Sequence, residues 1–276
     1  MAKTDSHRLA TSKRRAWVTG ASTGIGASFA RRLAQDGFDL ALVARSRERL
    51  ESLATELRRA HGISGDVVPA DLSRAADLQR IEDLVADDDA LELMVNNAGF
   101  GTAGRFAELD ADREEEEIRV NVVALTRLTR AALPRLIARG GGGVINVSSM
   151  AAFQPAPLNA TYAATKAFVN SFTEALHEEL RGTGVHVQAL CPGFTRTEFQ
   201  DRAGIDASGI PSFAWMMPEE VVDASLAGLA RGDVVCVPGI ANRLVAATTA
   251  AVPRAVVRRI LGVAVRRMLA GKSVER

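Results

Sequence analysis

The sequence predicts a doubly wound α/β fold, in which helices cover both faces of one seven-stranded, mostly parallel sheet. Short apolar runs rich in Val, Leu and Ala, bounded by Gly, Pro, Asp or Asn, are typical of buried strands. They alternate with longer stretches of helical period, and this alternation implies parallel strands joined by right-handed crossovers. The predicted strands are Ala16–Thr19, Leu40–Ala44, Asp66–Ala70, Leu91–Val95, Gly143–Val147, Val185–Leu190 and Val234–Val237. The intervening helical stretches include Ala27–Asp36, Glu48–Ala60, Ala75–Ala86 and Thr161–Arg181.

Length and composition exclude several classes of protein. The chain has 276 residues, of which 47% are hydrophobic and 24% charged, with a net charge of +1. This composition supports a large core and gives no basic field for nucleic acid. Because no linker interrupts the pattern, we expect a flexible terminus over 1–14, one domain over 15–240 and an extension over 241–276. The polar residues 1–14 do not read as a signal peptide, and no apolar run reaches the ~18 residues of a membrane span.

The cysteine and histidine content indicates neither a disulfide framework nor a metal site. Cys191 and Cys236 are the only cysteines, and each lies in an apolar stretch. Two thiols cannot form a disulfide framework, so we expect buried free thiols in a reducing cytoplasm. The four histidines lack ligand spacing, so no metal is expected. The acidic run Asp110–Glu117 is interpreted as a solvated first helical turn rather than a metal site. The glycine run Gly140–Gly143 is interpreted as a turn.

A glycine-rich segment follows the first predicted strand and opens the first helix. Its sequence, Thr19-Gly20-Ala21-Ser22-Thr23-Gly24-Ile25-Gly26, has the spacing G-x-x-x-G-x-G. Glycines in this position let the backbone turn sharply and approach a pyrophosphate, which is then held by free N–H groups of the helix. The segment therefore predicts a dinucleotide site, and its position between strand and helix strengthens an otherwise weak signal.

Three further motifs follow in order, and together they resemble the short-chain dehydrogenase/reductase family. Asn96-Asn97-Ala98-Gly99 follows the fourth strand, Tyr162-Ala163-Ala164-Thr165-Lys166 fits Y-x-x-x-K, and Pro192-Gly193 begins a P-G-x-x-x-T pattern that ends at Thr197. Ser149 precedes the tyrosine by thirteen residues. The resemblance covers about residues 15 to 240. It implies a Rossmann fold and oxidoreductase activity with a nicotinamide cofactor.

The resemblance also assigns roles to individual residues. It implies a catalytic set of Asn121, Ser149, Tyr162 and Lys166, in which Asn121 positions a water and Lys166 also holds the nicotinamide ribose. The cofactor-binding residues it implies are Gly20, Ser22, Thr23, Gly24, Ile25, Gly26, Arg45, Asp71, Leu72, Asn97, Ala98, Gly99, Tyr162, Lys166, Pro192, Gly193, Thr195 and Thr197.

The end of the second strand indicates the preferred cofactor. Relatives that use NAD place a carboxylate there for the ribose hydroxyls, whereas this chain has Ala44 followed by Arg45. A neutral side chain avoids repulsion of a 2′-phosphate, and arginine supplies a forked donor for it. We therefore predict NADP(H), to which Ser22 could add a hydroxyl contact. The alternative is that Arg45 is an ordinary surface residue.

The spacing of Tyr162 and Lys166 has a chemical reason. Residues four apart share one face of a helix. A phenol with a pKa of about 10 is a poor base at neutral pH. A nearby ammonium, helped by the positive nicotinamide of the oxidised cofactor, lowers that pKa. Tyr162 could then exchange a proton with the substrate oxygen while Ser149 stabilises the charge on it. Without its three partners, Tyr162 would be interpreted as a half-buried structural residue.

The segment after the sixth strand predicts the substrate class. The resemblance places a substrate lid over about 198–217, and this segment is apolar and rich in methionine, which suits a hydrophobic carbonyl substrate such as a ketoacyl or other lipid-like compound. The same side chains could instead pack the lid onto the body. We predict that Ser149, Phe100, Phe153 and Phe199 contact the substrate.

Beyond the core, Pro253–Ala270 reads as a basic amphipathic helix with an apolar stripe. Packing on its own subunit, a subunit interface and peripheral contact with an anionic membrane are the alternatives. The family resemblance implies a homodimer or homotetramer. Alternative functions are an NADPH-binding sensor or scaffold without turnover, and a cofactor-recycling isomerase or epimerase.

Overall fold

The sheet confirms the predicted fold class. The structure, a computed structural model, describes residues 14–204, 211–252, 255–259 and 262. Its seven strands form one sheet in the order β3-β2-β1-β4-β5-β6-β7, and every neighbouring pair is parallel. The sheet is thus wholly rather than mostly parallel. The strands are β1 Arg15–Thr19, β2 Asp39–Ala44, β3 Gly65–Pro69, β4 Leu91–Asn96, β5 Gly142–Val147, β6 Val185–Leu190 and β7 Val235–Cys236.

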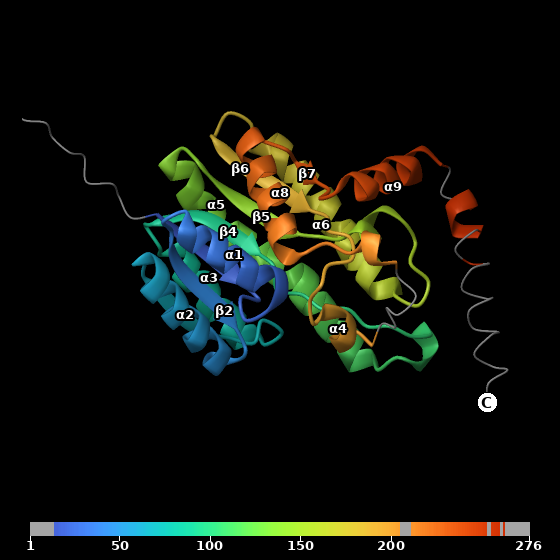
Figure 1. Cartoon of the computed structure of the whole chain (residues 1–276), viewed down its shortest axis with the longest axis horizontal. Coiled ribbons are helices and arrows are strands. Elements are labelled where there is room, and N and C mark those ends of the chain that lie inside the picture. The colour runs from blue at the N-terminus through green and yellow to red at the C-terminus, as the bar shows by residue number, and fades with distance from the viewer. Residues whose placement is uncertain (1–13, 205–210, 253–254, 260–261, 263–276) are drawn as a thin grey trace, which may run out of the picture.

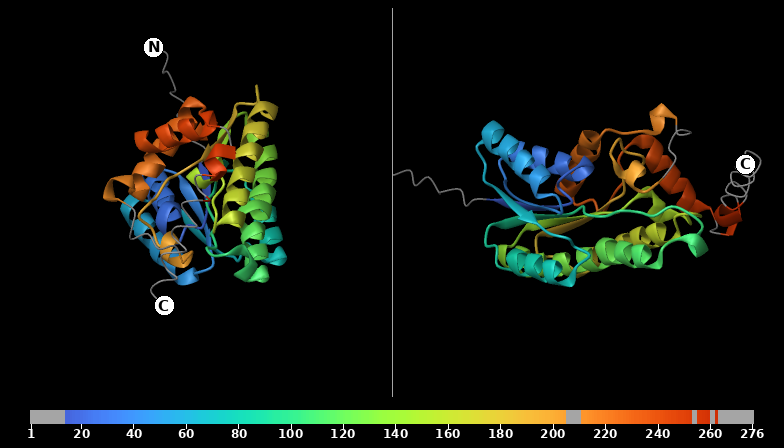
Figure 2. Two further views of the ribbon diagram at one scale, coloured as in Figure 1. Left: turned by 90° about the vertical axis from the view of Figure 1, so that its right-hand side faces the viewer. Right: turned by 90° about the horizontal axis from the view of Figure 1, so that it is seen from below.

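Helices form a layer on each face of the sheet (Figures 1 and 2). On one face lie α1 (Gly24–Gln35), α2 (Arg47–His61) and α8 (Pro218–Arg231), and on the other lie α3 (Ala75–Ala86), α5 (Leu125–Arg139) and α6 (Ala160–Glu179). The remaining helical segments are η1 (Phe106–Glu108), α4 (Ala111–Ile118), η2 (Arg119–Ala124), η3 (Met150–Phe153), α7 (Phe199–Arg202), η4 (Ser212–Ala214) and α9 (Ile240–Ala251).

Strand β2 illustrates how the sequence builds two cores. Successive strand residues point to opposite faces. Leu40 and Leu42 pack into the core beneath α1 and α2, whereas Ala41 and Val43 pack into the core beneath α3 and α5. A strand buried on both faces is continuously apolar. This accounts for the uninterrupted apolar runs in the sequence.

The helix ends follow the local chemistry of capping. Ser46 is the N-cap of α2 and its side chain accepts a hydrogen bond from the Arg49 N–H. The same helix ends at Gly62, whose φ of 68° places it in the left-handed region that glycine adopts without strain. Asp110 caps α4 by accepting from the N–H groups of Asp112 and Arg113. The acidic run therefore does begin a helix.

The strand order places a crevice at the carboxyl ends of β1 and β4. The chain builds outward from β1 to β3 and then returns to start β4 on the other side of β1. Helices on either side of this reversal leave in opposite directions, and ligands of open α/β sheets bind there. The segments that follow β1, β4, β5 and β6 carry the motifs singled out in the sequence. The topology therefore gathers them at one edge.

The two cysteines and the C-terminal part of the chain were also subjects of sequence predictions. Cys191 and Cys236 are free and buried, as predicted. The first helix of the predicted extension is α9, which runs beside the body of the domain (Figure 1). Most of the predicted amphipathic helix Pro253–Ala270 lies outside the described residues. Within the part of the chain that is described, no helix is both long and apolar enough to span a membrane.

Core packing gives a first prediction. Phe29 of α1 is fully buried in the core, whereas the Phe106 side chain is 65% exposed. We expect Phe29→Ala to lower the free energy of unfolding by about 3–5 kcal/mol, because it removes apolar contacts and leaves a cavity. Phe106→Ala is the matched control and should change it by less than about 0.5 kcal/mol. Chemical denaturation measures both, and equal effects would contradict the assignment of this core.

Candidate functional site

The turn between β1 and α1 is built for close approach to a ligand. Gly20 and Gly24 have φ angles of 65° and 54°, in the left-handed region that favours glycine. A Cβ atom on Gly26 would collide with the carbonyl oxygen of Gly20, so this third glycine closes the turn. Thr23, the N-cap of α1, makes no side-chain capping bond. The first N–H groups of α1 are therefore left for a phosphate group.

The turn is held in place by Asn97 at the end of β4. The Asn97 side-chain amide donates to the carbonyl oxygens of Thr19 and Gly20 at 2.9 and 3.2 Å. The Thr19 hydroxyl in return accepts from the N–H groups of Asn97 and Ala98 at 3.0 and 2.9 Å. Asn97 thus braces two motifs that are far apart in the sequence.

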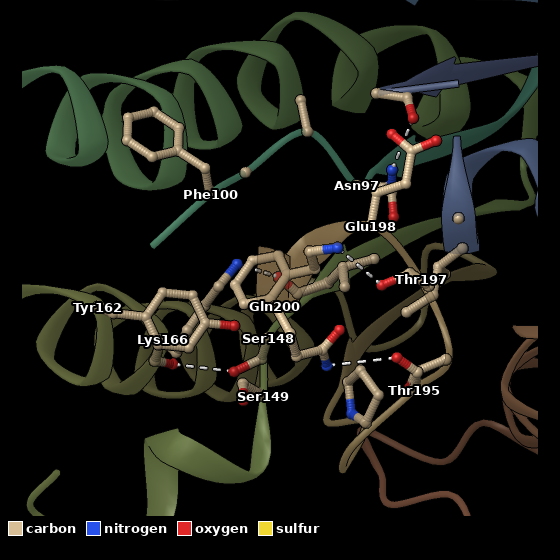
Figure 3. A pocket seen from close by; sticks show the side chains of 18 of the residues that line it. Asn97, Phe100, Ser148, Ser149, Tyr162, Lys166, Thr195, Thr197, Glu198 and Gln200 are labelled. Atoms are coloured by element: carbon tan, nitrogen blue, oxygen red, sulfur yellow. Dashed lines mark hydrogen bonds between the residues drawn. The ribbon is translucent and has the colours of Figure 1, made fainter. Parts of the chain in front are cut away.

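A single cavity of about 1090 Å³ lies above the strand ends. Almost all of the predicted site residues line it (Figure 3). Three predicted residues do not: Gly26, which packs inside its turn, Asn121 and Phe153. The correction for Phe153 has a local cause, since the η3 turn presents Met150 and Ala151 to the cavity instead. The predicted residues that line it are Gly20, Ser22, Thr23, Gly24, Ile25, Arg45, Asp71, Leu72, Asn97, Ala98, Gly99, Phe100, Ser149, Tyr162, Lys166, Pro192, Gly193, Thr195, Thr197 and Phe199.

Ser149, Tyr162 and Lys166 meet on one wall of this cavity (Figure 3). Ser149 follows β5, and its side chain acts on that of Tyr162 by lowering the pKa of the phenol. Lys166 is buried, with its Nζ donating to the Val147 carbonyl oxygen at 2.8 Å and lying 5.7 Å from the centre of the Tyr162 ring. Phe199 packs on the same ring at a centroid distance of 5.5 Å. The structure thus brings the three predicted groups together.

Burial dominates the electrostatics of the tyrosine and the lysine. Desolvation raises the pKa of Tyr162 to about 12, against a smaller lowering by the hydrogen bond with Ser149. Desolvation also lowers the pKa of Lys166 to about 8. The sequence argument expected the lysine cation, together with the positive nicotinamide of the oxidised cofactor, to lower the pKa of Tyr162. In the protein alone, burial outweighs the lysine and the pKa is raised. The free energy needed to remove a phenolate from water exceeds the stabilisation it gains from the Lys166 ammonium, which lies 5.7 Å from the ring centre.

Asn121 lies in a π-helical segment, η2, between α4 and α5. Such segments are rare and occur mostly as local bulges at functional sites. The Asn121 amide donates to the Phe100 carbonyl at 2.8 Å and to the Thr165 hydroxyl at 3.1 Å, and its oxygen accepts from the Phe100 N–H at 3.1 Å. Its side chain therefore ties the segment after β4 to α6. It does not face the cavity.

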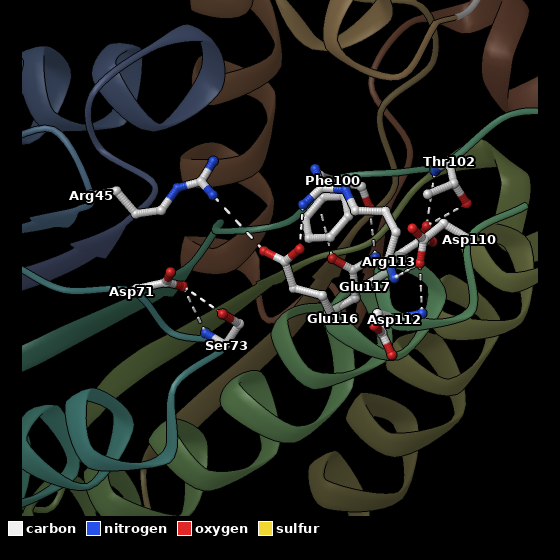
Figure 4. A network of polar contacts seen from close by, with 11 residues as sticks. Arg45, Asp71, Ser73, Phe100, Thr102, Asp110, Asp112, Arg113, Glu116 and Glu117 are labelled. Carbon is white, nitrogen blue, oxygen red and sulfur yellow. Dashed lines mark hydrogen bonds and ion pairs between the residues drawn. The ribbon is translucent and has the colours of Figure 1, made fainter.

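Arginines from the second strand end and α2 stand opposite carboxylates. Nη1 of Arg45 lies 3.9 Å from Oε1 of Glu116 (Figure 4), and Nη1 of Arg49 lies 3.2 Å from Oε2 of Glu198. All four side chains line the cavity. Arg49 was missed in the sequence, although it follows Arg45 by four residues. Both exposed arginines can exchange a carboxylate for a phosphate at little cost.

The segment predicted to be a substrate lid (198–217) and α9 both contribute to the cavity wall. Phe199, Gln200 and Ala214 line the cavity from the lid. Other residues of this segment pack it onto the body of the domain. Met216 contacts the core, and the ring centres of Trp215 and Phe194 are 5.7 Å apart. Ile205, Ile210 and the Phe213 side chain lie outside the described residues. From α9, the residues that line the cavity are Ala241, Asn242 and Val245, which sequence reasoning missed.

The acidic run is only partly solvated, which corrects the prediction for it. Glu114 and Glu117 of α4 are buried, Glu117 completely. They face inward because they are three apart on one side of the helix. Among the described residues, no group of three or more His, Cys, Asp or Glu is placed to hold a metal ion.

Comparison with known proteins identifies the family. The sequence profile of the short chain dehydrogenases matches residues 14–207, and the chain belongs to this family. It is 33% identical to the very-long-chain 3-oxoacyl-CoA reductase of Anas platyrhynchos over 219 residues, which is 76% of this chain and 68% of the relative. The protein is therefore an oxidoreductase by family.

Solved structures agree with this assignment. A short-chain dehydrogenase from Sphingobium yanoikuyae in complex with NADPH superposes with a TM-score of 0.80 and 40% identity, covering 86% of this chain and 93% of that one. The bulky-bulky ketone specific alcohol dehydrogenase from Comamonas testosteroni superposes with a TM-score of 0.75 and 35% identity, covering 83% and 88%.

Proposed function

We propose that the protein is an NADP(H)-dependent oxidoreductase that reduces the ketone group of a bulky, hydrophobic substrate. The observation that carries this proposal is that Ser149, Tyr162 and Lys166 share one cavity with the glycine turn and with Arg45. A nicotinamide bound above the strand ends supplies the hydride. The protein's own residues then have to orient the substrate oxygen and deliver a proton to it.

Tyr162 is the proton donor in this mechanism. A carbonyl oxygen placed between the hydroxyls of Ser149 and Tyr162 accepts a hydrogen bond from each. As charge develops on the oxygen, Ser149 stabilises it and Tyr162 transfers its proton. The buried Lys166 ammonium, 5.7 Å from the ring centre, stabilises the phenolate that remains. Asn121 acts from behind by holding α6, through Thr165, against the segment after β4.

The protonation state of Tyr162 favours reduction. Because its pKa lies at about 12 in the protein alone, the phenol keeps its proton throughout the neutral range. Reduction requires this protonated form, whereas alcohol oxidation must begin by removing the proton. The NADPH-bound relative from Sphingobium supports the same choice of cofactor. Cells keep NADPH largely reduced, which fits the reductive direction.

The cavity walls indicate the substrate class. Phe199 packs on the Tyr162 ring, and Phe100, Val245 and Ala214 add further apolar surface to the cavity. Apolar walls with a few convergent polar groups suit a hydrophobic ligand. The relatives named for bulky ketones and for very-long-chain 3-oxoacyl-CoA support this class. A panel that compares diaryl ketones, long 3-oxoacyl thioesters and ketose sugars, followed by NADPH oxidation, tests it.

The mechanism predicts the outcome of removing one oxygen atom. Tyr162 is the only tyrosine in the chain. We expect Tyr162→Phe to lower kcat for ketone reduction by about 10²–10⁴-fold, because it removes the proton donor. NADPH affinity, measured by fluorescence titration, should change little. Activity within about threefold of the wild type would contradict the role of Tyr162. In the wild-type protein, conversion of the ketone without net NADPH oxidation would instead indicate an isomerase.

The cofactor assignment predicts a change of preference. Arg45→Asp should lower kcat/KM with NADPH by about tenfold or more and raise the relative efficiency with NADH, because it replaces a phosphate donor with a repelling charge. Arg47→Asp is the matched control, since Arg47 is two residues away, 66% exposed and absent from the cavity wall. An unchanged NADPH/NADH ratio in Arg45→Asp, or an equal change in both variants, would overturn the assignment.

A further inference from the structure

Two buried carboxyl groups lie behind the tyrosine, outside the site derived above. Glu114 and Glu117 face inward from α4, where this helix packs on the start of α6 and on the segment after β4. Both carboxyl groups contact the Thr102 hydroxyl, and Figure 4 shows Thr102 together with Glu117. Thr161, the neighbour of Tyr162, donates its hydroxyl to Oε2 of Glu114. The cluster therefore touches the helix that carries the tyrosine and the lysine.

The hydrogen bonds of this cluster require an additional proton. The Thr102 hydroxyl oxygen lies 2.5 Å from Oε1 of Glu114 and 2.8 Å from Oε2 of Glu117. A hydroxyl carries one proton and can donate it to one acceptor only. If both carboxyl groups were ionised, one of the two contacts would bring oxygen lone pairs together. A proton on one of the carboxyl groups, donated to Thr102, removes this repulsion.

The proton belongs to Glu117. Glu114 is satisfied as an anion, because Thr161 and Thr102 can both donate to it. Glu117 receives only the Thr102 N–H at 2.8 Å, and its other oxygen, Oε1, is buried without a hydrogen-bond partner. A buried carboxylate with an unpartnered oxygen is costly. Burial accordingly raises the pKa of Glu117 to about 7, with Glu114 as a further cause.

Glu117 is coupled to both groups that handle the proton. The charged and titratable groups that act on it are Glu114 from its own helix and Lys166 from α6. In turn, the Glu117 charge raises the pKa of Lys166 and that of Tyr162. Val147 supplies only a neutral carbonyl to the Lys166 ammonium. The hydrogen bond to this carbonyl does not compensate the positive charge of the buried Lys166 ammonium. When ionised, Glu117 is thus an anionic partner for that charge.

We propose that Glu117 is a positioning residue that can hold a proton in the Thr102 cluster and, by releasing it, keeps Lys166 charged and Tyr162 protonated as the medium becomes alkaline. This inference rests on the proposed function of those two residues. Because the pKa of Glu117 is about 7 and that of Lys166 about 8, Glu117 becomes neutral in the pH range in which Lys166 keeps its proton. At higher pH, the Glu117 anion offsets the tendency of Lys166 to lose its proton.

The pH dependence of ketone reduction tests the proposal. Glu117→Gln keeps the size of the side chain and a donor for Thr102 but cannot become an anion. We expect the alkaline limb of kcat/KM to move down by about one pH unit, with activity near pH 6 within about twofold of the wild type. Glu115→Gln is the matched control, because Glu115 lies on the same helix with a side chain that is 62% exposed, and its profile should overlay that of the wild type.

Loss of activity by the same factor at every pH would mean that Glu117 is merely structural and would overturn the proposal. So would an alkaline limb that does not move. Glu117→Asp restores a carboxyl group and should move the limb back toward the wild-type position. These outcomes are read in the NADPH-loaded enzyme, with thermal melting to confirm that each variant is folded.

Infrared titration tests the bound proton without turnover. The wild-type protein should show a protonated carboxyl C=O band that disappears as the pH is raised through about 7. That band should be missing in Glu117→Gln and present in Glu115→Gln. A wild-type band that does not titrate in the neutral range would overturn the proposal even if ketone reduction is confirmed. If no ketone is reduced, the proposed function fails while the titration still decides the state of Glu117.

Discussion

The burial of one cation organises this site. Lys166 lies almost wholly inside the protein, and its ammonium is fixed by the Val147 carbonyl at the end of β5. A charge removed from water is costly unless its surroundings are arranged around it. The Ser148 hydroxyl, donating to the Lys166 carbonyl at 3.0 Å, fixes the same turn of α6 against β5. With Lys166 fixed, Tyr162 one turn earlier has little freedom, and it lines the cavity.

Close backbone approach is the second constraint, and it explains glycines that no unusual dihedral angle requires. A Cβ atom on Gly99 would stand 2.8 Å from Oδ1 of Asn121, and one on Gly101 would stand 2.9 Å from Cδ2 of Tyr162. Neither glycine has a positive φ. Such distances are shorter than van der Waals contact, so the segment after β4 can lie against α6 only without side chains. The tyrosine thus has a wall on one side made of backbone.

Much of this arrangement could be predicted from the sequence, because it depends on local patterns. Continuous apolar runs give the strands, parallel strands align their carboxyl ends, and a spacing of four places Tyr162 and Lys166 on one helix face. The wall formed by α9 could not be predicted, since nothing in Ala241 or Val245 indicates which surface they face. The burial of Glu114 and Glu117 was hidden because α4 reads as uniformly charged. The sequence likewise does not show that η3 brings Met150 and Ala151, rather than Phe153, to the cavity wall. These features depend on tertiary packing.

Desolvation explains why the pKa of Tyr162 is raised in the protein alone, whereas its spacing from Lys166, taken by itself, predicts a lowered pKa. A lysine four residues from a tyrosine lowers the pKa of the phenol only if the charge–charge attraction exceeds the penalty for burying the phenolate. Here both groups are buried, and burial favours the neutral form of each. It raises the pKa of the Tyr162 phenol to about 12 and lowers the pKa of the Lys166 ammonium to about 8. A neutral phenol has a proton to donate, and the ammonium beside it holds its own proton more weakly than a lysine in water. Burial of both side chains thus supports the proposed role of Tyr162 as a proton donor, whereas removal of its proton would be favoured by a further positive charge beside it.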